Sequence, residues 1–465
     1  MDPPMSSSSS STQLPYLWPT GALDERFQTT DGNLFSSAVL KDTGSSLSGD
    51  SRWPAFFPAP IAFLTTGSGD RTVLERTVGP MIVNRFPLVM AVSLCREQLS
   101  ERHYARRSTM EALERNGTGA VQFLAPGQPL TSALAAIESE PDARATSRAR
   151  RSGLAMREAR QTATGVLSDA YLVYEGRLAR PGVSLDGVRT YDRPWHDVGS
   201  HRVYFLEVVA IHLKTAIARG EKQVAWQSLP EWTPTEQVET PPYDAGHLAD
   251  GRYVKGYTPQ YRFPAAGTVA FEADDIDGDM SIRHLEPLAR DQVVVDNERA
   301  RWPCFFPSSA GMLTAWRDDR RPTAMPCGST AIVSRLPLTF AACLSNSAIN
   351  ERYAPRATLG VIRARGRFGV GVAYGDADIV RAISYLGNVS GQTDPDKVRH
   401  AGLAALQGGS SPVLAQLPIH FDCRLTGEVL LGTHVMVTGE VERIHVRRDV
   451  TPERPLTWQP WARVV

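Results

Sequence analysis

Short apolar runs, each bounded by glycine, proline or arginine, dominate the hydrophobic pattern of the chain. They lie at residues 61–66, 81–83 and 88–94 in the first half, and at 310–315, 331–333 and 338–344 in the second. Runs of this length with such boundaries predict buried strands. Longer apolar stretches at 202–211 and 434–446 predict one closing strand in each half.

Each half also contains a predicted helix, at 108–116 and at 357–365. Each helix is followed by a glycine, Gly117 or Gly366, as expected of a C-terminal stop. A strand is expected at 368–372, and helical stretches at about 129–170 and 376–405. Many short strands with few helices predict a small β-barrel with helical insertions rather than alternating βα units.

The chain carries a long internal repeat. Arg-Trp-Pro-Ala-Phe-Phe-Pro at 52–58 returns as Arg-Trp-Pro-Cys-Phe-Phe-Pro at 301–307, 249 positions later. Further matching pairs are 82–88 with 332–338, 101–105 with 351–354, 199–201 with 432–434, and 211–212 with 444–445. A period of this length exceeds a solenoid unit and indicates a duplicated domain, so one chain can imitate a two-fold dimer.

The repeat divides the chain into four parts. Residues 1–50 are rich in Ser, Gly and Pro and are expected to form a disordered N-terminal arm rather than a signal peptide. Residues 51–265 form the first copy, 266–300 a connection, and 301–465 the second copy.

Composition narrows the class of protein. The 50 basic and 50 acidic residues cancel, which removes the electrostatic reason to expect nucleic acid or an anionic membrane as partner. There is no apolar stretch of membrane-spanning length. Five scattered cysteines without a Cys-x-x-Cys pair argue against zinc and against a disulfide framework, so we expect a soluble protein of the reducing cytoplasm.

Two charged segments leave alternatives open. The Arg-rich stretch at 144–160 fits a solvated helix face or loop, and a phosphate-binding surface is the second interpretation. The acidic run at 274–279 resembles a calcium loop, but Met280 stands where such a loop needs glycine, which favours a solvated turn.

Familiar signatures of hydrolases and nucleotide-binding sites are missing. The chain has no Gly-x-Ser-x-Gly, His-Glu-x-x-His or Walker loop. The glycines at 366–371 fall at a helix end and inside a strand, so they do not form a Rossmann turn. Barrels bind flavins and nicotinamides in other ways, so the missing Rossmann turn does not exclude either cofactor.

Several segments of the second copy follow one another in a characteristic order. They are 302–307, 328–337, 352–358, 366–368, 385–391, 397–403, 411–412, 421–425, 431–441 and 455–458. In this order they resemble the flavin reductase-like family of FMN-binding split barrels, especially its flavoredoxin-type members. The resemblance implies a mainly β fold with helical insertions, in which two tandem FMN-binding split β-barrels form an intrachain pseudo-dimer.

The first copy resembles the same family less closely. It lacks a counterpart of 385–391 and carries a longer, Arg-rich stretch at 126–198. Leu206 also stands where the second copy has Gly439. A first barrel that has lost part of a cofactor site is therefore one possible interpretation.

The resemblance implies a set of cofactor-binding residues on one strand and at one helix start. They are Ser329, Thr330, Ser334, Arg335, Arg352, Tyr353, Arg356 and Thr358. Hydroxyls, a guanidinium and helix N-terminal amides suit the FMN phosphate. The structural alternatives are that the serine and arginine before Pro337 form a turn, and that Thr358 caps the helix.

Two histidines, His434 and His201, are the candidate catalytic residues. In the resembled family, a histidine near this position can face the nicotinamide or the flavin ring, and imidazole can move a proton near neutral pH. A lone histidine at a strand start is more often a packing residue, but both copies carry it in the same context.

The leading function implied by the resemblance is an oxidoreductase that binds FMN, or FAD in its place. It would take hydride from NAD(P)H and could supply reduced flavin to a partner monooxygenase, as a monomeric pseudo-dimer or a homo-oligomer. A non-redox isomerase or cyclase of a small metabolite, using the same pocket, is the alternative. A non-catalytic flavin-binding module is a third interpretation.

Overall fold

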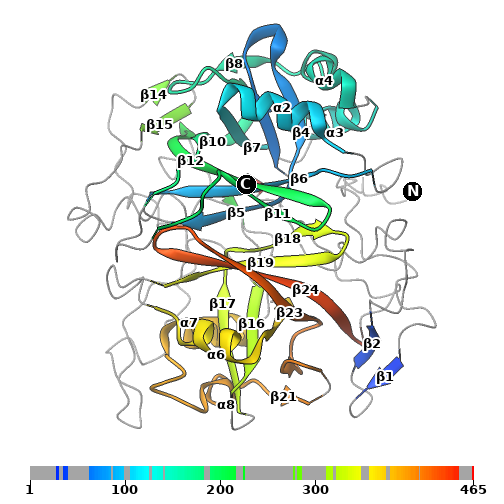
Figure 1. Cartoon of the computed structure of the whole chain (residues 1–465), viewed down its shortest axis with the longest axis vertical. Coiled ribbons are helices and arrows are strands. Elements are labelled where there is room, and N and C mark those ends of the chain that lie inside the picture. The colour runs from blue at the N-terminus through cyan, green and yellow to red at the C-terminus, as the bar shows by residue number, and fades with distance from the viewer. Residues whose placement is uncertain are drawn as a thin grey trace, which may run out of the picture.

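The chain is represented by a computed structural model, and it consists mostly of antiparallel strands (Figure 1). The structure describes residues 28–30, 35–39, 62–84, 87–98, 105–124, 128–139, 142–182, 189–215, 224–225, 276–277, 280–284, 311–317, 321–346, 355–372, 377–407, 409–449 and 463–464. The repeated motifs at 52–58 and 301–307 lie outside these residues.

The first copy forms the upper half of Figure 1. Its strands are β3 (Phe63–Thr66), β4 (Val73–Arg76), β5 (Val78–Asn84), β6 (Val89–Cys95), β7 (Thr118–Leu124), β8 (Met156–Glu158), β9 (Gly165–Leu167), β10 (Ala170–Leu178), β11 (Trp195–Val198) and β12 (His201–Lys214). Its helices are η2 (Gly69–Arg71), α2 (Arg107–Asn116), α3 (Gln128–Ser139), η3 (Asp142–Arg144) and α4 (Ala145–Arg151).

The second copy forms the lower half. Its strands are β16 (Gly311–Trp316), β17 (Pro322–Cys327), β18 (Thr330–Arg335), β19 (Leu338–Ser345), β20 (Arg367–Val372), β21 (Ala405–Leu406), β22 (Val413–Leu414), β23 (Ile419–Leu430) and β24 (His434–Arg447). Its helices are α6 (Ala357–Arg365), α7 (Ala377–Asn388) and α8 (Lys397–His400). A short pair, β13 (Val224–Ala225) and β25 (Arg463–Val464), joins the ends of the two copies.

Both copies have the same sheet order. In the first, the order is β12-β10-β7-β3-β4, with β6 and then β5 added beside β12. In the second, the order is β24-β23-β20-β16-β17, with β19 and then β18 added beside β24. The predicted strands are therefore confirmed, and so are both helices with their C-terminal glycines, which adopt the left-handed conformation.

The pattern missed some strands and extended two helical regions too far. Residues from Met156 onward form the short pair β8 and β9 and then the long strand β10, not a helix. In the second copy, Gly391 and Pro395 follow α7, and only the one-turn helix α8 forms after them. Glycine and proline disfavour helix continuation, and tertiary pairing selects the strand conformation for β10.

Two hairpins are exchanged between the copies. The pair β1 (Gln28–Thr30) and β2 (Phe35–Val39) precedes the first copy, but β2 pairs with β24 of the second. The pair β14 (Ile276–Asp277) and β15 (Met280–His284) precedes the second copy, but β15 pairs with β12 of the first. The first hairpin falls within the predicted arm and the second within the predicted connection. Of the acidic run, only Ile276 and Asp277 lie within the described residues, and they form β14.

The two barrels pack against each other in the middle of the molecule, where β18 contacts β5, β6 and β12, and β24 contacts β5 (Figure 1). One buried apolar cluster contains side chains from both copies, among them Phe205 of the first and Met436 of the second. The hydroxyl of Ser93 donates across the interface to the carbonyl oxygen of Val333, at 2.6 Å. Because burial of apolar surface is the main driving force for association, this cluster holds the copies together.

Gly199 permits a close backbone approach between the copies. Its φ is +50°, and a Cβ atom there would lie 2.6 Å from both the carbonyl oxygen of Leu336 and the hydroxyl of Ser334. A side chain at this position would therefore push the halves apart, and only glycine adopts this φ without a steric cost.

Leu206 takes part in a volume exchange within the core. In the second copy, a Cβ atom at Gly439 would lie 2.5 Å from the ring of Phe368, so the ring occupies that space. In the first copy, Gly119 takes the place of Phe368, as the matching strand registers show. Gly176 likewise takes the place of Cys423, whose Cβ is the other close neighbour of Gly439, so a side chain at position 206 meets neither a ring nor a second Cβ atom. These two glycines account for Leu206 without any change in a cofactor site.

Replacing Gly439 with Leu is expected to lower the free energy of unfolding by about 1–3 kcal/mol, because the new side chain overlaps the Phe368 ring. The double change Gly439→Leu with Phe368→Gly removes the closer of the two overlaps and leaves that with Cys423, at 2.9 Å, so it should restore part of this loss. Urea unfolding of the three proteins measures both effects. A double variant no more stable than Gly439→Leu would contradict the exchange.

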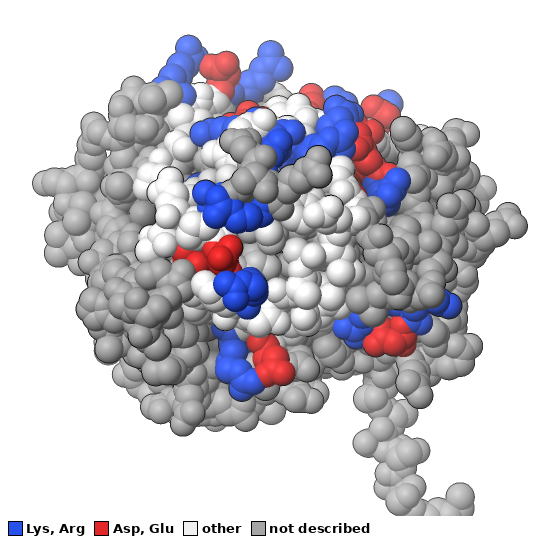
Figure 2. All heavy atoms as spheres, turned by 90° about the horizontal axis from the view of Figure 1, so that it is seen from below, with Lys and Arg blue, Asp and Glu red and all other residues white. Residues whose placement is uncertain are grey.

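The surface shows no broad field of one charge sign over the described residues at the second copy's end (Figure 2). Acidic side chains lie among the basic ones there. Elsewhere among the described residues of the second copy, ion pairs such as Arg363–Glu428 and Arg424–Glu440 join surface charges of opposite sign. Among the described residues, no helix is long and apolar enough to cross a membrane.

Candidate functional site

The start of α6 is the first part of the candidate site. Arg356 is its N-cap residue, and its backbone N–H donates to the carbonyl oxygen of Ser345 at 3.0 Å. Within the described residues no side chain caps this helix, and Thr358, which is buried in the first turn, does not have the capping role considered above. Uncapped amides at a helix start favour an anionic group.

Positive charge gathers at the same place. Lys397 is buried, and its ammonium group donates to the carbonyl oxygens of Val389 at 3.1 Å and Leu386 at 3.4 Å, at the C-terminal end of α7. Burial first, and then the charges of Arg356 and Arg317, lower the pKa of Lys397 to about 7, although the charge of Asp394 raises it. These cations are close enough to repel one another, which an anion would relieve.

His434 lies beside this helix start. It pairs across the sheet with Ser345, the residue that accepts the hydrogen bond from Arg356. Its side chain is 7 % exposed, and its Nδ1 lies 2.7 Å from the hydroxyl of Thr433. The histidine and the α6 start are therefore two parts of one region.

Asn84 of the first copy determines the proton position on His434. Its Oδ1 accepts from the Thr433 amide at 2.9 Å, the Thr433 hydroxyl at 2.8 Å and the His434 amide at 3.1 Å. Its Nδ2 donates to the carbonyl oxygen of Pro87, which fixes the amide orientation. Since the Thr433 proton goes to Asn84, the hydroxyl must accept from His434 Nδ1–H, and Nε2 is the atom that can gain or lose a proton.

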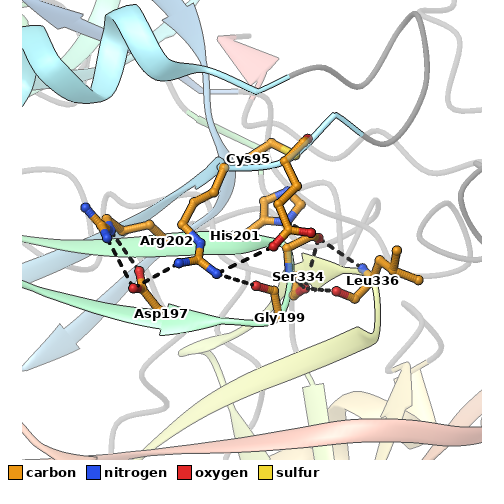
Figure 3. Close-up of polar contacts among 10 residues, drawn as sticks. Cys95, Asp197, Gly199, His201, Arg202, Ser334 and Leu336 are labelled. Atoms are coloured by element: carbon orange, nitrogen blue, oxygen red, sulfur yellow. Dashed lines mark hydrogen bonds and ion pairs between the residues drawn. The ribbon is translucent and has the colours of Figure 1, made fainter.

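His201 has a related but less constrained environment (Figure 3). Its Nδ1 lies 2.8 Å from the hydroxyl of Ser200, and this hydroxyl lies 3.3 Å from that of Ser334. The Ser200 hydroxyl also accepts from the Leu336 amide at 3.1 Å. Serine can donate or accept where asparagine oxygen only accepts, so these contacts leave the His201 tautomer open.

The structure divides the predicted cofactor residues into two groups. Ser334 is fully buried against Ser200, and the charge of Arg335 acts on Cys95, beside His201. Burial lowers the pKa of Arg335 to about 10. These two residues of the second copy therefore face the first copy's histidine rather than His434.

The other group lies with His434 and α6. Thr330 is buried and donates to the carbonyl oxygen of Cys327 at 3.0 Å. The positive charge of Arg356 acts on the Cys327 thiol, so Thr330 lies near Arg356. Ser329 is half-buried and its carbonyl oxygen accepts from the Cys343 amide. The predicted residues Arg352 and Tyr353 lie outside the described part of the chain.

The helix start of the first copy contains a buried ion cluster. Glu75 is completely buried, and Arg148 Nη1 lies 2.5 Å from its carboxylate. Arg106, the N-cap residue of α2, lies 3.4 Å from the same carboxylate, and the Thr109 hydroxyl donates to it at 3.4 Å. Within the predicted Arg-rich stretch, Arg148 thus turns inward, whereas Arg144, Arg150, Arg151 and Arg160 are exposed.

Each copy also has a buried carboxylate–histidine pair that the sequence reasoning missed. In the first, Glu175 contacts His212 and accepts from the amides of Arg160, Gln161 and Thr162. Burial raises the pKa of Glu175, but the hydrogen bond and charge of His212 and the two amides of Arg160 and Gln161 outweigh it and lower the pKa to about 2. The pair fixes the loop before β9.

The second copy has an equivalent carboxylate–histidine pair. Asp422 lies 3.0 Å from His445 and accepts from the amides of Ser410 and Ser411. Both histidines stood in the repeat as matching Ile-His pairs, which was a usable signal. Their carboxylate partners lie on β10 and β23, which the hydrophobic pattern did not predict, so the pairing was not visible.

The comparison with known families decides the family. The model of the flavin reductase like domain matches residues 55–227 and again residues 304–462. The chain belongs to the flavin reductase-like family. Both the resemblance and the tandem split-barrel fold predicted above are thereby confirmed, and this family member carries the domain twice.

Solved structures include similar flavin reductase-like chains. Flavoredoxin of Desulfovibrio vulgaris is 22% identical over 30% of this chain and 71% of its own, with a TM-score of 0.27. Nitrilotriacetate monooxygenase component B from Bacillus cereus is 19% identical over 31% and 72%, with a TM-score of 0.27. BorF, the flavin reductase component of a bacterial two-component tryptophan halogenase, is 22% identical over 32% and 89%, with a TM-score of 0.26. No curated protein matches the chain.

The residues of the second copy suit a flavin phosphate. The α6 start offers amides that the N-cap side chain leaves uncapped, the Arg356 guanidinium and the neighbouring Lys397, which a phosphate would favour in its charged form. Such a donor set matches a dianionic phosphate, which needs amides and charge-assisted hydrogen bonds.

Proposed function

We propose that this chain is an FMN-dependent oxidoreductase that takes hydride from NAD(P)H and reduces flavin. The observation that carries the proposal is the juxtaposition of the cationic α6 start with His434 across a single strand pair, β19 and β24. One end of the region suits a phosphate, and the other holds an imidazole that can exchange a proton.

Arg356 and the amides of the first turn of α6 would bind the phosphate, with Thr358 beside them. Lys397 would contribute charge rather than a direct contact, because its ammonium group already donates to the end of α7. Among the predicted cofactor residues, Ser329 and Thr330 belong to the group near α6 and His434, and their contact with flavin is part of this proposal. Arg352 and Tyr353 stay predictions.

The flavin would supply the hydride-accepting ring when bound. His434 would hold or move a proton at Nε2, since Nδ1–H is engaged by Thr433. Burial of this imidazole restricts exchange with bulk water, which suits a group that must deliver a proton at one place.

We propose further that the reduced flavin serves a separate oxygen-using enzyme. Two of the similar solved structures are components of a monooxygenase and a halogenase system. Their names suggest that this chain could likewise supply reduced flavin to an oxygenase. A coupled assay with such an oxygenase would test this.

Spectroscopy of the purified protein tests the proposal directly. Added FMN should bind with a change in its absorption bands, and NAD(P)H should bleach them. Protein that stays colourless and does not titrate with FMN would contradict the reductase proposal. A non-redox isomerase or cyclase would then be the better candidate.

Replacing His434 with Ala should lower the rate of NAD(P)H-dependent flavin reduction at least tenfold, because a positioned proton donor is lost. FMN affinity should change much less than the rate. Stopped-flow absorbance measures the reduction, and an unchanged rate would remove His434 from the mechanism.

A further inference from the structure

The two copies differ at the position that faces the helix start. On β3, Leu64 pairs with Glu75, and on β16 the corresponding Leu313 pairs with Met325. Glu75 and Met325 therefore occupy equivalent positions, one charged and one apolar.

The arginines that they face are equivalent too. The amide of Arg106 donates to the carbonyl oxygen of Cys95, and that of Arg356 donates to the carbonyl oxygen of Ser345. Cys95 and Ser345 each end the strand that pairs with the copy's own histidine. The first copy thus has the same backbone frame as the second, with a carboxylate added.

The added carboxylate takes the role that a ligand's anion would have. Glu75 is fully buried and is contacted by Arg148, Arg106 and the Thr109 hydroxyl, which are a cation pair and a donor of the kind a phosphate needs. Arg148 comes from α4, in the stretch where the first copy departs from the family pattern. A dianionic phosphate brought to this helix start would meet a buried negative charge, and like charges repel strongly where water is excluded.

The second copy has the opposite balance. Met325 brings no charge, and Lys397 is acted on by the charges of Arg356 and Arg317, which the buried carboxylate of Asp394 opposes only in part. The electrostatic preference for an anion is therefore confined to one of two otherwise matching places.

We propose that this chain binds a single FMN, in the second copy, and that Glu75 and Arg148 close the equivalent site of the first copy from within. The inference rests on the proposed flavin binding. The first copy then serves the working site through the interface, where Asn84 orients His434.

Binding stoichiometry tests this directly on the full-length protein. Titration with FMN, followed by flavin fluorescence and by ultrafiltration of the free flavin, should give one FMN per chain. Two FMN per chain would overturn the inference and leave the reductase proposal standing. No FMN binding would overturn both.

A matched pair of variants locates the site. Arg356→Met should weaken FMN binding at least tenfold and reduce the preference for FMN over riboflavin, which lacks the phosphate. Arg106→Met should leave the dissociation constant within twofold of the wild-type value. The reverse result, loss with Arg106→Met and none with Arg356→Met, would overturn the inference. If one variant does not fold, the other alone locates the site, because only a change in the copy that binds FMN weakens binding.

Discussion

Replacing Arg148 with Met should lower the free energy of unfolding by about 3–5 kcal/mol, because it leaves the buried Glu75 carboxylate without its closest partner. Arg106 lies 3.4 Å from the carboxylate, too far to replace a contact of 2.5 Å fully. Urea unfolding followed by circular dichroism measures the loss.

Two controls separate the ion pair from general damage to α4. Arg151→Met changes an exposed arginine of the same helix and should alter stability by no more than about 0.5 kcal/mol. The double variant Glu75→Met with Arg148→Met should regain most of the loss, since an apolar pair of similar volume removes the buried charge, as Met325 does in the second copy. A double variant as unstable as Arg148→Met would show that the carboxylate is not the cause.

Replacing Asn84 with Leu should cost about 3 kcal/mol or more, because two amides and one hydroxyl lose their common acceptor at the interface. The Thr433 hydroxyl would then be free to donate to His434 Nδ1. The imidazole should shift from the Nδ1–H to the Nε2–H tautomer.

Nitrogen NMR of the histidine side chains detects this shift, and it does not depend on bound flavin. Asn84→Asp keeps the acceptor oxygen and serves as the control, with the Nδ1–H tautomer retained. Asn84→Ser copies the equivalent position of the second copy, Ser334, and should give mixed tautomers. An unchanged His434 tautomer in Asn84→Leu would contradict the role of Asn84.

The candidate site was partly visible in the sequence. The repeated Gly-Ser/Thr-His element marked both histidines, and the family resemblance marked Arg356 and Thr358. Their grouping was not visible, because Ser334 and Arg335 belong by sequence to the second copy but lie beside His201 of the first. The contacts responsible join residues 134 positions apart, beyond any local pattern.

The exchanged hairpins show the same limit. The pairs Asp277-Gly278 and Asp31-Gly32 are each typical of a hairpin turn, which local sequence is enough to predict. The sheet that each hairpin joins depends on how the two barrels pack, and each joined the sheet of the other copy.

The sequence by itself determined the duplication, nine of the strands and both principal helices, because these follow from local periodicity, terminal glycines and motifs that return about 249 positions later. Only the tertiary structure decided that the two copies are electrostatically different. Glu75 and Arg148 are 73 positions apart, and Asn84 and His434 are 350 apart. Buried charges and hydrogen bonds acquire their roles from the partners that folding brings to them, and those partners come from distant segments and from the other copy.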